Sequence, residues 1–275
     1  MRFLFLITIV IGLIFGNKGI AQKKAEVYYN SGVNKSKQLE YLGAIQDYNK
    51  AIELNPKYTL AYLDRGNARA AISDYKGAIQ DYSKAIEYIH PSLAGGIYTN
   101  RGLSKINISD HKGAIEDFTN AIEINPNDDN AYHERGYAKG ALEDYSGAIQ
   151  DFTKTININP NYLKAYTNRG LTKVKISDYR GAIKDYNKAI EIDKYNARAY
   201  SLRGNAKSML KDFRGAIQDY NYAIMINEKD ASSYLSRGLC KSMLGDKDGA
   251  CLDLSKAGEL GDGRAYDMIN KICND

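Results

Sequence analysis

A repeat of 34 residues dominates this sequence. It is plainest from Asp129 to Tyr162, DNAYHERGYAKGALEDYSGAIQDFTKTININPNY. When the sequence is aligned with itself, one glycine of each copy falls into register, with steps of 34 residues and a single step of 36. These glycines are Gly32, Gly66, Gly102, Gly136, Gly170, Gly204 and Gly238. A fixed period of this length predicts an array of stacked units and not a single globular core.

Each copy is expected to form two helices. In its first half, Tyr132 and Gly136 lie four residues apart, which places them on one face of a helix. In its second half, Ala148 and Phe152 have the same spacing. Pro160 then ends the second helix, because proline has no N–H to donate and disfavours helical geometry in the residue before it. The unit is therefore predicted to be a helical hairpin.

The pattern closely resembles the tetratricopeptide repeat (TPR), whose framework has aromatic, alanine and proline residues at set offsets. The aromatic near the start of each repeat is Tyr28, Tyr62, Tyr98, Tyr132, Tyr166, Tyr200 or Tyr234. The alanine that opens the second helix is Ala44, Ala78, Ala114, Ala148, Ala182, Ala216 or Ala250. Departures from the framework are Lys194 and Glu228 at the closing proline, Thr155 at the second alanine and Leu254 at the second aromatic.

The resemblance implies an all-α fold, a right-handed solenoid of seven helix-turn-helix repeats with a C-terminal capping helix. The expected repeats are residues 25–58, 59–94, 95–128, 129–162, 163–196, 197–230 and 231–262. Residues 263–275 follow a glycine-rich break and are expected to cap the last hairpin, because a terminal repeat otherwise exposes its apolar face.

Residues 1–21 are of another kind and predict a cleaved secretory signal. A positive charge at Arg2 precedes an apolar run from Phe3 to Phe15, and Gly19 and Ala21 place small residues three and one positions before a possible cleavage site. A retained membrane anchor is the weaker alternative, because a spanning helix needs about 20 apolar residues. We expect the mature chain to begin near Gln22 and the protein to be exported, periplasmic or secreted.

Two regular rows of charge run through the repeats. In six repeats an arginine before the repeat glycine has an aspartate sixteen residues later, and a hairpin turn midway brings the two positions face to face; in repeat one Ser31 replaces the arginine, while Asp47 remains. The expected ion pairs are Arg65–Asp81, Arg101–Asp117, Arg135–Asp151, Arg169–Asp185, Arg203–Asp219 and Arg237–Asp253. Because the arginine fork suits a carboxylate and the net charge of +5 is modest, structural pairs are favoured over a polyanion or nucleic-acid site.

No catalytic constellation accompanies the repeats. His90, His111 and His133 are scattered without metal-ligand spacing, and the sequence contains no phosphate-binding glycine loop or nucleophile elbow. The sequence therefore favours a non-catalytic protein without a metal or cofactor.

The seven repeats can be compared position by position, counting each from its first residue. Positions 4, 7, 8 and 11 of the first helix are nearly constant, whereas positions 2, 5, 9, 12 and 13 vary and fall on the opposite side. In TPR proteins that side lines the concave groove. The candidate groove residues are Tyr29, Leu63, Asn67, Leu103, His133, Tyr137, Leu171, Lys175, Asn205, Leu235 and Leu239. The alternative is that these side chains pack between adjacent first helices.

The three cysteines lie near the C-terminus. In an antiparallel stack Cys251 comes close to Cys273, and an oxidising compartment would permit a disulfide between them. The alternative is that Cys240, Cys251 and Cys273 are all buried small residues.

These features together predict an interaction scaffold that binds a protein or peptide in the groove, outside the cytoplasm. The alternatives are a structural component of an envelope assembly, or a module associated with a carbohydrate polymer or an enzyme. Neither nucleic acid nor a membrane is expected as a partner, apart from membrane contact through the signal segment before cleavage.

Overall fold

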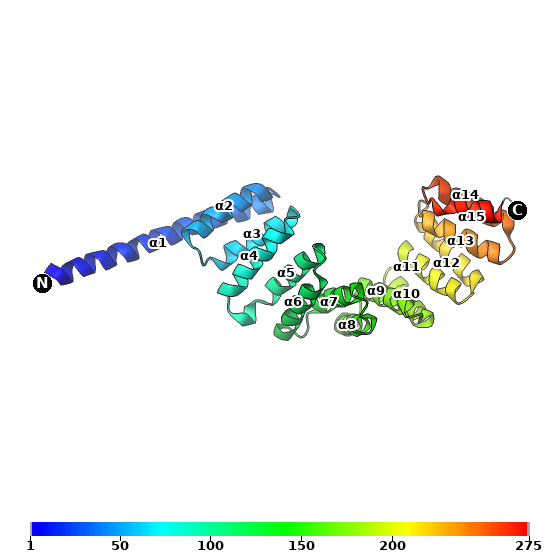
Figure 1. The fold of residues 1–275 in the computed structure, drawn as a ribbon, viewed down its shortest axis with the longest axis horizontal. Helices are drawn as coiled ribbons and strands as arrows, with labels where there is room; N and C mark the ends of the chain where they lie inside the picture. The colour runs from blue at the N-terminus through cyan, green and yellow to red at the C-terminus, as the bar shows by residue number, and fades with distance from the viewer. Residues whose placement is uncertain (1, 274–275) are drawn as a thin grey trace. The chain divides into compact units, whose positions relative to one another are not determined.

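The computed structural model describes residues 2–273, with side chains from Gly19 onward. It divides into two compact units, residues 1–138 and 139–275, each of which is described by itself. The described residues form α-helices joined by short turns, with no strand among them (Figure 1). The expected all-α repeat fold is therefore confirmed.

The first unit is built of antiparallel helical hairpins. Its helices are α1 (Arg2–Lys37), α2 (Tyr41–Leu54), α3 (Thr59–Ala71), α4 (Tyr75–Tyr88), α5 (Gly95–Asn107), α6 (His111–Ile124) and the first part of α7 (Asp129–Ala141). A short 3-10 helix, Pro91–Leu93, takes up the single longer step of the repeat. The expected signal lies at the start of α1, where the side chains of residues 1–18 are outside the described residues.

The second unit continues the same pattern. Its helices are α8 (Tyr145–Ile158), α9 (Leu163–Lys175), α10 (Tyr179–Ile192), α11 (Ala197–Met209), α12 (Phe213–Ile226), α13 (Ala231–Met243), α14 (Lys247–Glu259) and α15 (Arg264–Ile272). In the described residues no helix combines the length and apolar composition that crossing a membrane requires.

Six of the seven hairpin turns have the same structure, and the turn of repeat one differs because Glu40 makes no side-chain cap there. The residue fifteenth in the repeat adopts a positive φ, such as 65° at Ser73 and 63° at Lys211. An aspartate follows it and accepts a hydrogen bond of 2.9–3.0 Å from the backbone N–H three residues on, which caps the second helix. These caps are Asp74, Asp110, Asp144, Asp178, Asp212 and Asp246.

The two helices of a hairpin touch where the repeat glycine meets an aromatic ring. The Tyr82 ring lies over Gly66, and a Cβ at that glycine would be 2.7 Å from the ring atom Cε1. Tyr82 is only 2% exposed, and fully buried alanines such as Ala78 and Ala85 surround it. Close packing of large rings on glycine and alanine therefore explains why these residue types recur with the period.

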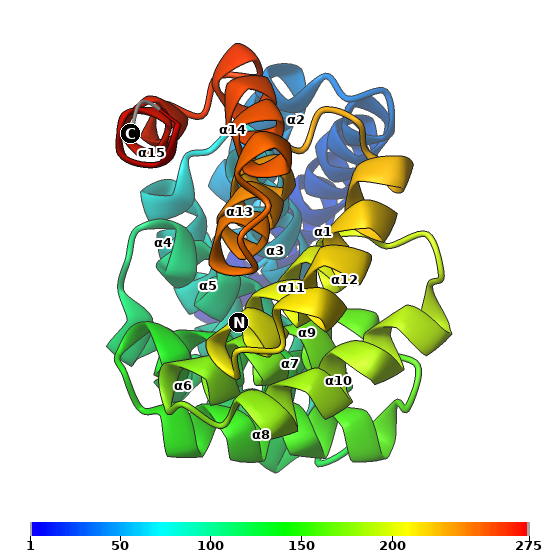
Figure 2. The ribbon, with the colours of Figure 1, turned by 90° about the vertical axis from the view of Figure 1, so that its right-hand side faces the viewer.

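The last helix, α15, closes the second unit. It lies beside α14 (Figure 2), buries Ala265, and is joined to α14 by a disulfide between Cys251 and Cys273, whose Cα atoms are 5.8 Å apart. The third cysteine, Cys240, is buried and free.

We expect α15 to depend on this bridge, because a helix of nine residues is marginal by itself. The Cys273→Ser variant should lose amide-exchange protection over residues 264–272, while α9–α12 keep theirs. Cys240→Ser, which retains the bridge, is the control. Equal protection of α15 in both variants would show that its packing alone holds it.

Candidate functional site

Five of the six predicted arginine–aspartate pairs are formed in the structure. In each of these, arginine Nη2 lies 2.6 Å from one carboxylate oxygen, and Nε donates to the other at 2.8–3.0 Å. The aspartates are buried, and Asp219 is 2% exposed. Arg135 and Asp151 belong to different units, and their pairing stays a prediction.

A lysine or arginine four residues after each arginine position binds the same carboxylate. Lys207, for example, places its Nζ 2.8 Å from Oδ2 of Asp219. The equivalent contacts are Lys35–Asp47, Arg69–Asp81, Lys105–Asp117, Lys139–Asp151, Lys173–Asp185 and Lys241–Asp253. In the sequence this second cation precedes the aspartate by a constant spacing of twelve residues. The residue types alone did not show that two cations share one carboxylate.

The arginine also reaches the preceding repeat. Nη1 of Arg203 donates to Asn187 at 2.7 Å, and its guanidinium carbon lies 5.4 Å from the centre of the Tyr200 ring. In repeat one, Ser31 takes the arginine position and donates to Asp47 at 2.7 Å. We call the arginine, its aspartate and the second cation the clamp of a repeat. Because every nitrogen of the clamp arginine is used, the geometry favours a structural role over a polyanion site.

Position 5 of the first helix does not form an exposed surface. Five of its side chains are buried, namely Thr99, His133, Thr167, Ser201 and Leu235, while Tyr29 and Leu63 are half-buried. The neighbouring first helix covers them, as the 3.0 Å hydrogen bond from Ser233 to Ser201 shows. At position 5 the structure therefore agrees with the alternative, in which these side chains pack between adjacent first helices.

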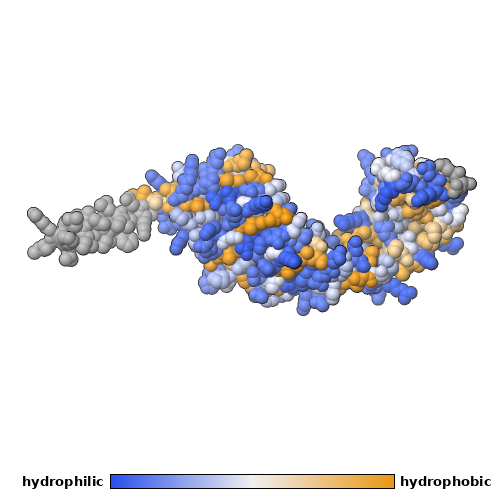
Figure 3. Space-filling view, viewed as in Figure 1, coloured by the Kyte–Doolittle hydropathy of each residue, from blue (hydrophilic) through white to orange (hydrophobic). Residues whose placement is uncertain are grey.

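The exposed strip consists of positions 2, 6, 9 and 13, which we call the first-helix face. Asn67, Tyr137, Lys175 and Asn205 are exposed on it. Leu103, Leu171 and Leu239 are partly exposed there. Figure 3 shows stripes of hydrophobic residues between hydrophilic ones on the side of the molecule that it draws.

Two asparagines on this face accept hydrogen bonds from tyrosines of the second helix in the same repeat. Tyr82 donates to Oδ1 of Asn67 at 2.9 Å, and Tyr220 donates to Oδ1 of Asn205 at 2.8 Å. The carbonyl oxygen of Asn205 is engaged and the residue is exposed, so its amide N–H₂ can donate to the backbone carbonyl of a partner.

Repeat five has the tyrosine without the asparagine. Leu171 stands at position 9, and the hydroxyl of the buried Tyr186 has no hydrogen-bond partner among the described residues. Burial, followed by the nearby Asp185 carboxylate, raises the pKa of the Tyr186 phenol, while Arg198 acts in the opposite direction.

We expect Tyr186→Phe to stabilise the second unit by about 1 kcal/mol, because a buried hydroxyl without a partner is unfavourable. Tyr220→Phe should instead destabilise it by about 1 kcal/mol, since it breaks the bond to Asn205. Urea unfolding of the two variants checks this. A loss of stability in both would mean that Tyr186 has a bound water as its partner.

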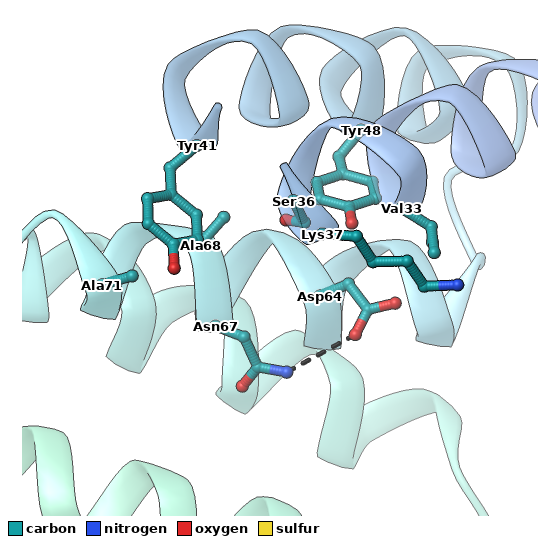
Figure 4. A pocket seen from close by; sticks show the side chains of 9 residues that line it. All are labelled: Val33, Ser36, Lys37, Tyr41, Tyr48, Asp64, Asn67, Ala68 and Ala71. Atoms are coloured by element: carbon teal, nitrogen blue, oxygen red, sulfur yellow. Dashed lines mark hydrogen bonds between the residues drawn. The ribbon is translucent and has the colours of Figure 1, made fainter. Parts of the chain in front are cut away.

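In the first unit the first-helix face is hollowed by a pocket of about 370 Å³ that α1, α2 and α3 line (Figure 4). Tyr41 and Tyr48 line it together with Lys37 and Asp64. Asp64 accepts a 2.8 Å hydrogen bond from Tyr29. Burial, and next this hydrogen bond, raises the pKa of the Tyr29 phenol. The pocket combines aromatic walls with one carboxylate and one ammonium group.

Within residues 2–273 no group of three or more histidine, cysteine, aspartate or glutamate side chains could hold a metal ion. His133 is buried, 2.9 Å from Glu134, and His90 is hydrogen-bonded to Ser92. His90 and His133 therefore have local structural contacts, whereas the buried Nδ1 of His111 has no hydrogen-bond partner among the described residues.

The stacked hairpins define a class, the all-α repeat solenoid. Two family models match the chain: TPR repeat at residues 37–73 and 173–211, and Tetratricopeptide repeat at residues 95–128 and 129–162. The chain therefore carries tetratricopeptide repeats and folds as a TPR solenoid.

Several solved structures are similar to it. MamA is 26% identical over 63% of this chain and 93% of its own, with a TM-score of 0.58. The C-terminal part of a TPR repeat-containing protein from Cytophaga hutchinsonii is 17% identical over 87% of this chain and 98% of its own, with a TM-score of 0.74. YrrB, described as a TPR protein with an unusual peptide-binding site, is 20% identical over 68% and 95%, with a TM-score of 0.58. No curated protein sequence matches the chain.

Proposed function

We propose that this protein is a non-catalytic scaffold that binds a segment of another protein on its first-helix faces, outside the cytoplasm. The observation that carries the proposal is that some positions of each repeat serve its structure while others are exposed and variable. Positions 7, 11 and 23 of each repeat form the clamp, and positions 8 and 24 form the core. These five positions therefore serve the structure of the repeat. Positions 2, 9 and 13 are mostly exposed and differ from repeat to repeat.

The chemistry of the face suits a polypeptide. Asn205 presents an amide held in one orientation, and the exposed Tyr137 offers an anchor of low rotamer entropy. The similar fold of YrrB, which is described as having a peptide-binding site, is consistent with this use of a TPR array.

Two observations support a location outside the cytoplasm. The basic and then apolar segment at residues 1–21 has the composition of a secretory signal. The bridge between Cys251 and Cys273 is of a kind that persists in oxidising compartments. N-terminal sequencing of the protein from its native source tests the proposal, with a start near Gln22 as the expected result and an intact Met1 as the contrary one.

Site-specific photo-crosslinking tests the binding surface. A photoreactive residue replaces Asn205 on the first-helix face, and a second variant carries it at Gln218, exposed on α12. Both are expressed in the native host and their adducts are mapped by mass spectrometry. We expect one partner segment to crosslink reproducibly at position 205 and not at position 218.

A second candidate, assembly through the outer face, is favoured by an exposed apolar pair on α12. Tyr222 is 50% and Met225 67% exposed. Lysine–glutamate ion pairs occupy the equivalent positions at Lys84–Glu87, Lys188–Glu191 and Lys256–Glu259. Crosslinks from position 222 with none from position 205 would transfer the function to this outer surface.

A further inference from the structure

The first-helix faces of the two units carry opposite charge. In the first unit the face has three carboxylates, on Glu26, Asp64 and Glu134, and one ammonium group, on Lys37. In the second unit, positions 2, 6, 9 and 13 of α9, α11 and α13 include Lys164, Lys175 and Arg198 and no acidic residue. The remaining nine of these twelve positions are uncharged.

These three cations are not scaffold residues. Lys164, Lys175 and Arg198 are all exposed, and none forms an ion pair with a described residue. The clamp cations of the same helices contrast with them, because Arg169 and Lys173 are both bound to Asp185. Lys164 and Arg198 occupy the same position in successive repeats, so the positive charge continues from one first helix to the next.

Apolar side chains lie among the cations. Leu171, Leu202 and Leu239 are partly exposed on this face, and Met209 and Met243 are 59% and 67% exposed. Methionine side chains are flexible and adapt to irregular apolar partners. The face thus offers apolar contact and uncompensated positive charge together.

We propose that the first-helix face of the second unit binds an acidic segment of a partner protein, in which aspartate or glutamate alternates with leucine-like side chains. The carboxylates of the segment pair with Lys164, Lys175 and Arg198, and its apolar side chains cover Met209 and Met243. This rests on the proposed function and specifies the chemistry of the partner.

A nucleic acid fits this face less well. Single strands are bound by stacking of bases on aromatic side chains, and positions 2, 6, 9 and 13 of α9, α11 and α13 include no aromatic residue. The apolar residues there are leucine and methionine, which suit aliphatic partners.

Fluorescence anisotropy with the full chain tests the proposal. The probe is a labelled twelve-residue peptide of repeated Glu-Glu-Leu. Three comparison probes are the Lys-Lys-Leu peptide, the Glu-Glu-Ser peptide and a twelve-nucleotide thymidine oligomer. The double variant Lys164→Glu/Arg198→Glu removes the proposed contacts. Its matched control is Arg180→Glu/Lys184→Glu, which makes the same change in net charge at exposed positions of α10 in the same unit.

We expect the Glu-Glu-Leu peptide to bind best, the face variant to weaken it at least tenfold, and the control variant to change it less than twofold. Equal weakening by the two variants, or equal binding of the Glu-Glu-Ser peptide or the oligonucleotide, would overturn the proposal in favour of general attraction of anions. Another outcome is that the protein binds the Lys-Lys-Leu peptide and loses that binding in the Leu239→Ser variant. This result would overturn the preference for an acidic segment, but the proposed function would still hold. If no peptide binds, the acidic segment is overturned, and crosslinking at position 205 decides the proposed function separately.

Discussion

Replacing Asp219 by alanine is expected to destabilise α11 and α12 by about 3–5 kcal/mol, the range for removing one partner of a buried ion pair. Asp219 is 2% exposed and accepts from both Arg203 and Lys207. Its loss leaves two cations at a partly buried place with no counterion. Because Arg203 also donates to Asn187, the contact with the preceding repeat should weaken as well.

A double-mutant cycle separates pairing from simple loss of side chains. Arg203→Leu with Asp219→Leu should cost less than the sum of the single changes, because no unpaired arginine or aspartate then remains. Asp212→Ala is a matched control, since it removes a carboxylate of the same hairpin that serves only as an exposed helix cap, worth about 1 kcal/mol.

Hydrogen exchange during urea titration should be the measurement, because repeat arrays open in parts and one unfolding free energy does not describe them. Additive losses in the cycle would refute the pairing and return the arginine row to consideration as a polyanion site.

The clamp shows how much of the structure can be predicted from the period of the repeat. A spacing of sixteen residues across a turn was enough to pair Arg203 with Asp219, because the hairpin geometry follows from the period. The part taken by Lys207 was not evident, because Oδ2 of Asp219 binds both Arg203 Nε and Lys207 Nζ, an arrangement that spacing alone does not reveal.

Position 5 shows where the same reasoning failed. A helical wheel gives the side on which Ser201 and Leu235 lie, but not how much of that side the next repeat covers. The contact between Ser233 and Ser201 shows that the neighbouring first helix covers position 5. The binding face is therefore narrower than the set of variable positions.

The hairpin turns were only half predictable. Their aspartates are a residue type that favours the helix N-cap, so the caps could be predicted from the sequence. The positive φ of the residue just before each aspartate could not be predicted. Leucine, serine and glutamate, which stand there at Leu39, Ser73 and Glu143, rarely adopt a positive φ, and glycine is found at this position only at Gly245.

The other large effect is expected at the repeat glycine. Gly170→Ala should destabilise the second unit by about 2–3 kcal/mol, near the upper end for overpacking a core. The added Cβ would lie 2.6 Å from Cε1 of Tyr186, whose ring is fully buried and cannot withdraw. This outweighs the gain of about 1 kcal/mol that alanine usually brings to a helix in place of glycine.

Repeat seven supplies the control, because Leu254 replaces the aromatic ring there. A Cβ at Gly238 would meet its nearest neighbours at 3.1–3.2 Å, which small adjustments can relieve. Gly238→Ala should therefore change stability by less than about 1 kcal/mol, since helix propensity offsets the remaining crowding. Adding Tyr186→Leu to Gly170→Ala reproduces the arrangement of the Gly238→Ala variant in repeat seven and should recover part of the lost stability. If Gly170→Ala and Gly238→Ala are equally damaging, the ring is not the cause, and the glycine would instead be required by the approach of the two helix backbones.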